Sequence, residues 1–246
     1  MNSWKTSIAF ACCLFALLWT ANVQSGEPGS SSSSSSKDEK VEHVAVGKNV
    51  TFEKEGGKRR VLIEAEVCLR EGPLEQLLTK KQTKEHEAVL AVDTDATNIK
   101  TALLLTGAEP GSTVKFGDKV EPAKGPVVRI TLRYEEKGKT VTVPAKEWMR
   151  GTKGKKLPDF EWVFAGSKLV EGIRPKDPPY FLANDGDVIC VSNFESALLD
   201  INIASSADND SLDFEANTDK IPDKGTKVTI ILEPVVEKKD NDKKDK

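Results

Sequence analysis

Histidine and cysteine are scarce in this sequence, which has two histidines and four cysteines among its 246 residues. Cys12 and Cys13 lie in an apolar segment near the N-terminus, so removal of that segment would leave Cys68 and Cys190. Two thiols are too few for an iron–sulfur cluster of the usual kind, which is held by four cysteines. Thiol or metal chemistry would therefore depend on very few side chains.

An excess of charge of one sign is also lacking. Lysine and arginine number 36 and aspartate and glutamate 39, which gives a formal net charge of -3. Because both signs are interspersed along the chain, we expect no broad basic face and no binding to nucleic acid. The sequence also has no glycine-rich loop of the kind that cradles phosphates, so we expect no cofactor.

Long hydrophobic runs are missing as well. The longest extends from Ile8 to Leu18, about eleven residues, which is too short to span a bilayer. Lys5 precedes this run and small residues precede Gly26, as in an export signal that is cleaved. We therefore expect a signal peptide over residues 1–25, a periplasmic or extracellular location, and no membrane span after cleavage. The alternatives are a retained anchor and lipid attachment at Cys12, which would leave almost no apolar stretch before it.

Composition divides the remaining chain into three parts. Residues 26–43 contain a run of serines followed by charged residues, and such a segment cannot bury enough apolar surface to offset its ordering entropy. Residues 237–246 form a charged tail without apolar periodicity. Between them, residues 44–236 are expected to form one domain, since 38% hydrophobic residues suffice for a core.

Local patterns within the domain indicate both strands and helices. Alternating β-branched residues predict strands at 59–70 and 226–234, and 87–94 resembles another strand. Leu74, Leu77 and Leu78 follow Pro73 at helical spacing, which predicts a short helix there. The segment 95–107 predicts a second helix, with Asp95 as its cap and Gly107 as its end.

The later half of the domain contains turn signals between short apolar runs. Lys137-Gly138 lies between two alternating runs, as in a β-hairpin. Segments 161–167 and 180–194 predict three more strands, the last two joined by a tight turn at Asn184-Asp185-Gly186. We therefore predict an α+β domain, with a mainly antiparallel sheet of about seven strands and two or three short helices.

Several segments resemble the YdjY-domain proteins, a bacterial family of exported or envelope-associated proteins. The resemblance lies in "EAEVCLREGPLEQLLTKKQTKEHEAVL", "ALLLTGAEPG", "EWVFAGS", "DGDVICVSNFESALLD" and "FEANTDKIPDKGTKVTIILEP", and covers most of residues 60–234. It implies a shared fold unit and no particular chemistry. Members have sometimes carried a ferredoxin-like label, but the matching segments contain only Cys68 and Cys190.

Cys68 and His86 are the first candidates for a functional site. A thiolate and an imidazole form either a soft metal site or a nucleophile–base pair, with Glu87 or Glu75 as an orienting carboxylate. The helix-like segment between them would let the two flanking strands return side by side. A structural zinc site needs four ligands, and the sequence offers few further ligands beyond Cys190 and a carboxylate such as Glu87.

Two other interpretations of these residues remain open. Cys68 would be a small apolar core residue, and His86 would belong to the polar run "KEHE" on the surface. Alternatively, Cys68 and Cys190 would form a disulfide that closes a long loop, since disulfides persist in exported proteins.

These patterns favour a non-enzymatic exported domain that binds a small ligand or an envelope protein. The alternative is a metal-binding or thiol-dependent redox accessory or enzyme that uses Cys68 and His86.

Overall fold

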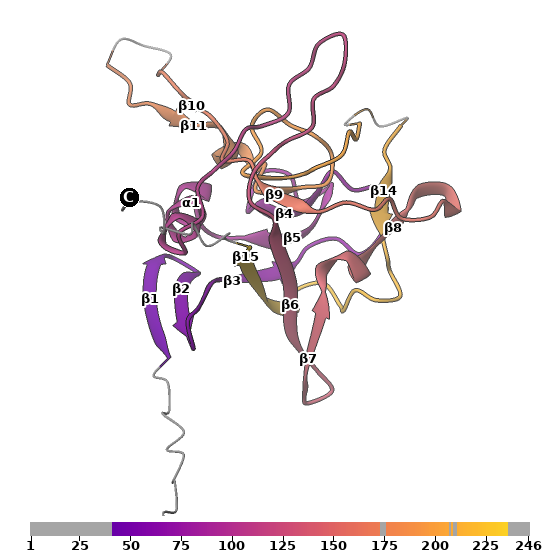
Figure 1. The fold of residues 1–246 in the computed structure, drawn as a ribbon. Helices are drawn as coiled ribbons and strands as arrows, with labels where there is room; N and C mark the ends of the chain where they lie inside the picture. The colour runs from indigo at the N-terminus through magenta and orange to yellow at the C-terminus, as the bar shows by residue number, and fades with distance from the viewer. Residues whose placement is uncertain (1–40, 173–175, 207, 209–210, 236–246) are drawn as a thin grey trace, which may run out of the picture. The chain divides into compact units, whose positions relative to one another are not determined.

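The computed structural model describes residues 41–172, 176–206, 208 and 211–235 (Figure 1). All of them belong to one compact unit, residues 39–246. The predicted signal peptide (1–25), residues 26–40 of the predicted linker and the predicted tail (237–246) lie outside the described residues.

The predicted α+β class is wrong, because the structure consists mostly of β-strands. Strand residues make up 42% of the described residues and helical residues 11%. The described part of the chain has one α-helix and a mixed sheet of 11 strands, where about seven strands and two or three helices were predicted. Several of the strands have only two or three residues, too short for an alternating pattern to show in the sequence.

The large sheet contains strands from the whole length of the domain. Its members are β1 (Glu42–Gly47), β2 (Val50–Glu55), β3 (Lys58–Val67), β4 (Gln76–Lys80), β5 (Ala88–Val92), β6 (Val128–Glu136), β7 (Lys139–Pro144), β9 (Trp162–Phe164), β12 (Ile189–Cys190), β13 (Leu199–Ile201) and β15 (Lys227–Pro234). The order along its main path is β7-β6-β15-β3-β5-β4-β12-β13-β9, and β1 joins it through β2, which pairs with β3. Val127, just before β6, forms a bridge with Val163 in β9, so the far end of the path returns to β6.

Strands β6, β15 and β3 form the regular centre of this sheet. They are antiparallel, and Ile230 of β15 is paired with Ile63 on one side and Leu132 on the other. All three side chains are fully buried, whereas Glu64 and Thr229 lie on the solvent face. The alternation that predicted strands at 59–70 and 226–234 is thereby confirmed.

The predicted helix after Pro73 is instead the strand β4. It runs parallel to β5 on one side and antiparallel to β12 on the other. Leu77 and Leu78, which point to opposite faces of a strand, are both fully buried. A strand buried on both faces shows an unbroken apolar run, and short runs of this kind cannot be told from a helix by spacing.

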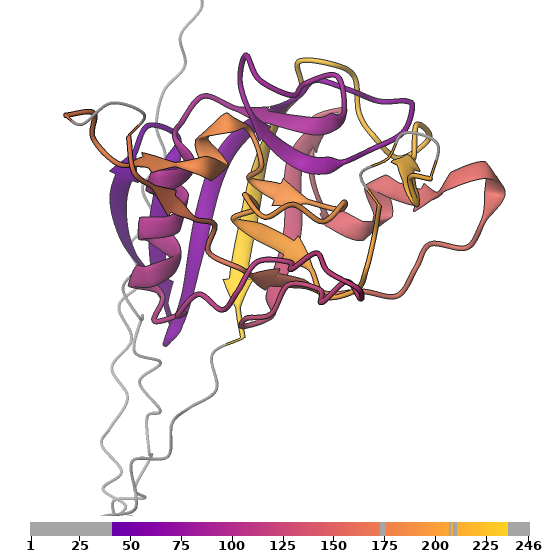
Figure 2. The same ribbon diagram turned by 90° about the horizontal axis from the view of Figure 1, so that it is seen from above.

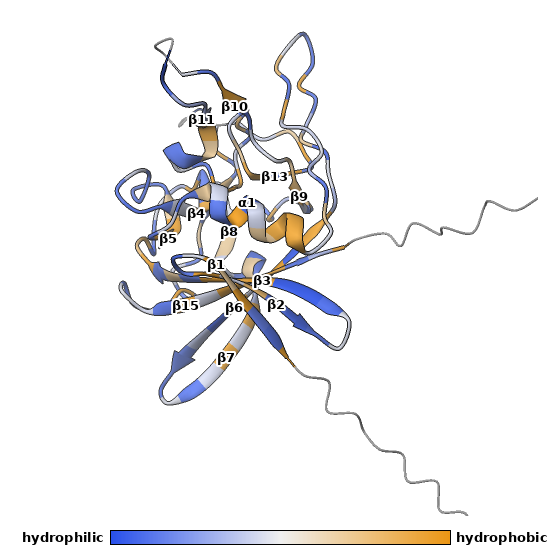
Figure 3. Ribbon diagram, turned by 90° about the vertical axis from the view of Figure 1, so that its left-hand side faces the viewer, coloured by the Kyte–Doolittle hydropathy of each residue, from blue (hydrophilic) through white to orange (hydrophobic). Residues whose placement is uncertain are grey.

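The helix predicted at 95–107 is confirmed as α1 (Ala96–Leu105), with Gly107 just beyond its end at a φ of 92°. Asp95 occupies the N-cap position but makes no capping hydrogen bond; it accepts one from Lys80 at 2.5 Å. The helix packs against β1, β2 and β3, as Figures 2 and 3 show. In the described part of the chain no helix is both long and apolar enough to cross a bilayer.

One of the two predicted hairpins is present. Strands β6 and β7 are joined at Lys137 and Gly138, both at positive φ, as a tight hairpin requires. The other prediction is wrong, because residues Leu182–Asp185 form a 3-10 helix (η3) before β12.

Smaller elements complete the described structure. β11 (Tyr180–Phe181) pairs with β10 (Leu169–Val170), and β8 (Met149–Gly151) pairs with β14 (Phe214–Ala216). Two short 3-10 helices, η1 (Ala145–Trp148) and η2 (Thr152–Gly154), flank β8.

The double burial of β4 predicts a large effect for one core substitution. Leu78→Ala should lower the free energy of unfolding by about 3 kcal/mol, because it removes buried methyl groups and leaves a cavity. Leu104→Ala is the control: this side chain is 45% exposed on α1, and its loss should change stability by less than about 0.5 kcal/mol. Urea denaturation checks both values, and equal effects would contradict the placement of β4.

Candidate functional site

Cys68 lies just after β3 and is partly buried. Its sulfhydryl donates a hydrogen bond to the carbonyl oxygen of Ala88 at 3.0 Å. Burial raises the pKa of the thiol to about 12, and the charge of Glu85 adds to this increase. The group therefore stays protonated at neutral pH, whereas nucleophilic attack and metal ligation both need the thiolate.

His86 lies in the turn before β5, and its side chain is 75% exposed. Its Nε2 atom lies 3.5 Å from a carboxylate oxygen of Glu87. Among the described residues no hydrogen bond joins it to Cys68, whose sulfhydryl is directed at Ala88. Each member of the predicted pair therefore has another polar partner, Ala88 for Cys68 and Glu87 for His86.

Cys190 lies in β12 and is fully buried, and both it and Cys68 are free thiols. Strands β5 and β4 lie between β3 and β12 in the sheet, so three interstrand spacings separate the two cysteines, about 14 Å. A disulfide needs Cα atoms less than about 7 Å apart. The two thiols therefore do not come within bonding reach.

Metal ligands are not grouped in the described residues. No set of three or more His, Cys, Asp or Glu side chains is arranged there to hold an ion. Cys68 and His86, the predicted metal candidates, belong to no such set among these residues.

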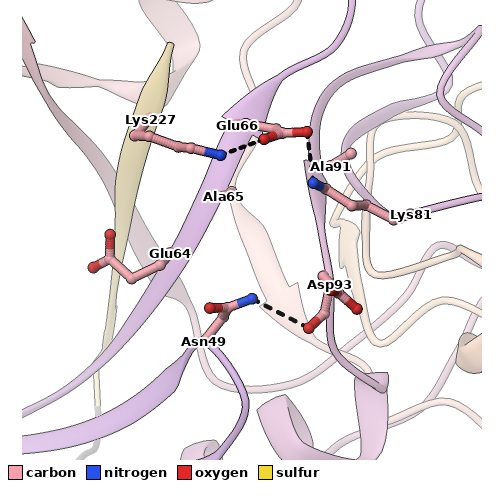
Figure 4. Close-up of a pocket in the computed structure, with 8 residues that line it drawn as sticks. All are labelled: Asn49, Glu64, Ala65, Glu66, Lys81, Ala91, Asp93 and Lys227. Atoms are coloured by element: carbon pink, nitrogen blue, oxygen red, sulfur yellow. Dashed lines mark hydrogen bonds and ion pairs between the residues drawn. The ribbon is translucent and has the colours of Figure 1, made fainter. Parts of the chain in front are cut away.

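A hollow on the sheet surface is the first of two polar sites (Figure 4). Its volume is about 270 Å³, and it lies over β3, β5 and β15. Glu66 is held at its rim by Lys81 at 2.6 Å and Lys227 at 2.5 Å, while Asn49 donates to the carbonyl oxygen of Asp93 at 3.2 Å. Its charges already pair with each other, so the hollow offers a ligand few unoccupied partners.

The second site is a cluster of polar side chains where β4 and β12 meet. We call it the Asp187 cluster, and it consists of Glu75, Gln76, Lys84, Glu87, Asp187, Phe194 and Ser196. One carboxylate oxygen of Asp187 accepts hydrogen bonds from Lys84 Nζ at 2.8 Å and from Gln76 Nε2 at 3.2 Å. The other accepts one from the Ser196 hydroxyl. The Asp187 side chain is only 6% exposed.

Two segments far apart in the sequence build this cluster. Backbone hydrogen bonds from Val191 and Ser192 to the carbonyl oxygen of Glu75 fix β12 against the start of β4. Gly186 places Asp187 with a φ of 122°, and a Cβ there would lie 2.5 Å from Thr83 Oγ1. Glycine is therefore required at this turn, where the chain passes the loop that carries Lys84.

Lys84 is the one cation in the Asp187 cluster. Burial alone would lower its pKa, but the hydrogen bond to Asp187 and the charges of Asp187 and Glu87 outweigh burial and raise it. Its Nζ atom lies 3.8 Å from a carboxylate oxygen of Glu87 and 4.6 Å from the ring centroid of Phe194. The ammonium group is thus held between carboxylates and an aromatic face.

Glu75 holds its proton to a higher pH than a glutamate in water. Burial raises its pKa to about 7, and repulsion from Glu87 adds to this more than the attraction of Lys84 removes. Asp200, fully buried in the neighbouring strand β13, also has its pKa raised by burial to about 7. Perturbed groups of this kind concentrate at functional sites.

Some buried polar atoms beside the cluster have no hydrogen-bond partner within the described structure. They are Gln76 Oε1, Ser192 Oγ and Asp200 Oδ2, which lie in or next to β4, β12 and β13. Such atoms cost stability, so each one calls for an explanation. Gln76 belongs to the Asp187 cluster itself, whereas Ser192 and Asp200 lie beside it.

Sequence patterns missed most of the Asp187 cluster. Only Glu75 and Glu87 were predicted as site residues, both as orienting carboxylates for Cys68 and His86. One signal was present: Asp187 and Asp200 are acids directly beside apolar runs, where a charged residue is costly unless it is paired. Lys84, Phe194 and Ser196 carry no such local signal.

The raised pKa values predict an unusual dependence of stability on pH. Because the folded chain holds the Glu75 proton more tightly than the unfolded chain, the free energy of unfolding should fall as pH rises from about 4.5 to 7, by about 3 kcal/mol from Glu75. Glu75→Gln should remove this part of the decrease, whereas Glu64→Gln on the solvent face should retain it. Urea unfolding at pH 5 and pH 8 measures the difference, and parallel curves for the wild type and Glu75→Gln would refute the assignment.

Comparison with known proteins gives one match. A family model described as the YdjY domain matches residues 50–233. No curated protein and no solved structure matches the chain. The match extends from β2 to β15 and includes the Asp187 cluster. The chain therefore belongs to the YdjY domain family.

Proposed function

We propose that this protein is an exported, non-enzymatic domain that binds a small ligand at the Asp187 cluster. The observation that carries this proposal is the set of buried polar atoms without partners around β4, β12 and β13. Folding has removed these atoms from water without supplying a hydrogen bond, a cost that ligand binding would offset.

The chemistry of the cysteines supports binding over a thiol-dependent reaction. Cys68, with a pKa of about 12, remains a thiol under ordinary conditions. Burial also raises the pKa of Cys190 well above its ordinary value. Neither sulfur is prepared for nucleophilic attack or for metal ligation.

The location of the Asp187 cluster also suits binding. The Lys84 and Glu87 side chains are 26% and 20% exposed, whereas that of Asp187 is 6% exposed. The cluster therefore reaches from the surface into the interior, as a recognition site for a small molecule does.

A panel of small molecules tests binding directly. Cationic, anionic and neutral compounds are added separately, and thermal unfolding is recorded for each. At least one class should raise the Tm by several degrees at saturation, because a ligand that binds only the folded state stabilises it. Ser196→Ala, which removes the hydroxyl that donates to Asp187, should reduce the shift. Glu66→Gln in the surface hollow is the control and should retain it; no shift with any class would refute the proposal.

Export rests on the N-terminal sequence and needs its own measurement. The apolar run at Ile8–Leu18 and the serines after Gly26 support a cleaved signal followed by a serine-rich linker. The full chain, produced in a bacterium with a functional export pathway, should appear outside the cytoplasm with a new N-terminus near Gly26. Replacing Leu14 and Leu17 by Asp should keep it inside, because charges break the apolar run. An uncleaved cytoplasmic wild-type chain would contradict export.

A further inference from the structure

We propose that the Asp187 cluster recognises a primary alkylammonium group of a small molecule, and that Lys84 occupies its place as an intramolecular stand-in. This inference rests on the proposed function and names its ligand class. Two observations support it: the groups that surround Lys84 Nζ, and the buried acceptor Gln76 Oε1, which has no hydrogen-bond partner within the described structure.

The surroundings of Lys84 Nζ match an ammonium ion in three ways. Asp187 accepts its hydrogen bond at 2.8 Å, and a Glu87 oxygen lies at 3.8 Å. The Phe194 ring, centred 4.6 Å away, covers it with a face that attracts cations. Carboxylates combined with an aromatic face are a common means of binding organic ammonium groups.

The charge of the cluster is not balanced by Lys84 alone. Glu75, Glu87 and Asp187 provide three carboxyl groups, against one ammonium group. Even while Glu75 holds its proton, two carboxylates face one cation, so a negative charge remains. Because this charge lies in a partly buried site, where screening by solvent is weak, it favours a ligand that carries more than one positive charge.

An unfilled acceptor lies against the same carboxylate. Gln76 is fully buried, and its Nε2 donates to Asp187 at 3.2 Å. The Oε1 atom of the same amide has no partner within the described structure. An ammonium group has three N–H donors, and Asp187 alone does not use them all. Because a small ligand is not tied to the loop backbone as Lys84 is, its ammonium group can direct one of these donors at Gln76 Oε1.

Lys84 lies in the short loop between β4 and β5. The loop between β4 and β5 is formed by turns, and Gln82 within it has a φ of 65°. Thr83 donates to the carbonyl oxygen of Lys80, and the backbone of Gln82 donates to Glu85. These bonds hold the loop backbone and do not involve the Lys84 side chain, so replacing its ammonium group by that of a ligand would not require the loop to unfold.

The size of the ligand follows from the lysine it replaces. The Lys84 side chain is a butylammonium group, and its end is enclosed by Phe194 and Asp187. A straight alkyl chain of similar length would follow the same path from the surface. A second amine at its outer end would then lie near the exposed part of the cluster, close to Glu87.

The variant Lys84→Ala removes the lysine side chain that occupies the proposed ligand site. Lys84→Ala should bind n-butylammonium and 1,4-diaminobutane at least about tenfold more tightly than the wild type, because these ligands no longer compete with Lys84. Lys81→Ala is the matched control: it removes a lysine of the same loop that pairs with Glu66, and should bind as the wild type does. Calorimetry gives the affinities, and 1-butanol replaces the amine in a parallel titration.

Four outcomes decide the inference. Tight amine binding by Lys84→Ala, lost in the double variant with Asp187→Asn and absent with 1-butanol, supports it. Equal binding of amine and alcohol overturns it, because the site would then select only the apolar chain. Binding of Nα-acetyl-lysine amide, but of neither n-butylammonium nor 1,4-diaminobutane, also overturns it, since the occupant would then be a lysine side chain of a protein. No amine binding by any variant overturns it too.

A second measurement keeps the inference separate from the proposed function. If the wild type responds to an anionic or neutral compound in the thermal panel while Lys84→Ala ignores amines, the binding role stands and the ammonium assignment fails. If neither experiment gives a response, both fail. Thermal unfolding of Lys84→Ala without ligand shows that the variant is folded at the temperature of the titration.

Discussion

The position of β4 between β5 and β12 is the constraint on which the rest of the structure depends. Parallel pairing with β5 and antiparallel pairing with β12 bury this strand on both faces and along both edges. Buried backbone N–H and C=O groups must form hydrogen bonds, so pairing with β5 and β12 holds β4 in one register. That register places Glu75 and Gln76 opposite the residues around Cys190, and so fixes which acids meet in the interior.

The ionisable groups in this interior lower the stability of the fold. Apolar side chains of the same size would pack at Glu75, Asp187 and Asp200 without the penalty of removing ionisable groups from water. The chain instead neutralises part of the charge by holding protons and part by inserting Lys84. A fold that needed only stability would have little reason to keep this arrangement, which is why the Asp187 cluster is a better candidate for function than the self-paired hollow beside Glu66.

Local patterns predicted the parts of the fold that one segment determines by itself. Strands β3 and β15, the hairpin at Lys137 and helix α1 follow from alternation, turn residues and helical spacing. Strand β4 did not, since a fully buried run has no polar face to set its period. The cluster did not either, because its members meet only through the pairing of β4 with β12, and no pattern within either segment reports the other. Cys68 and His86 drew attention because their residue types are rare, and rarity carries no information about distance.

The separation in sequence between the two halves of the Asp187 cluster has a consequence for how the protein acquires its site. Glu75, Lys84 and Glu87 are made early, and Asp187 and Ser196 follow about a hundred residues later. Closing a loop of that length is slow and entropically costly, so contacts of this kind form late during folding. A partly synthesised or partly folded chain would have its acids and its lysine in water, with ordinary protonation. The raised pKa values and the buried ion pair would therefore appear only with the complete domain, at the last stage of assembly.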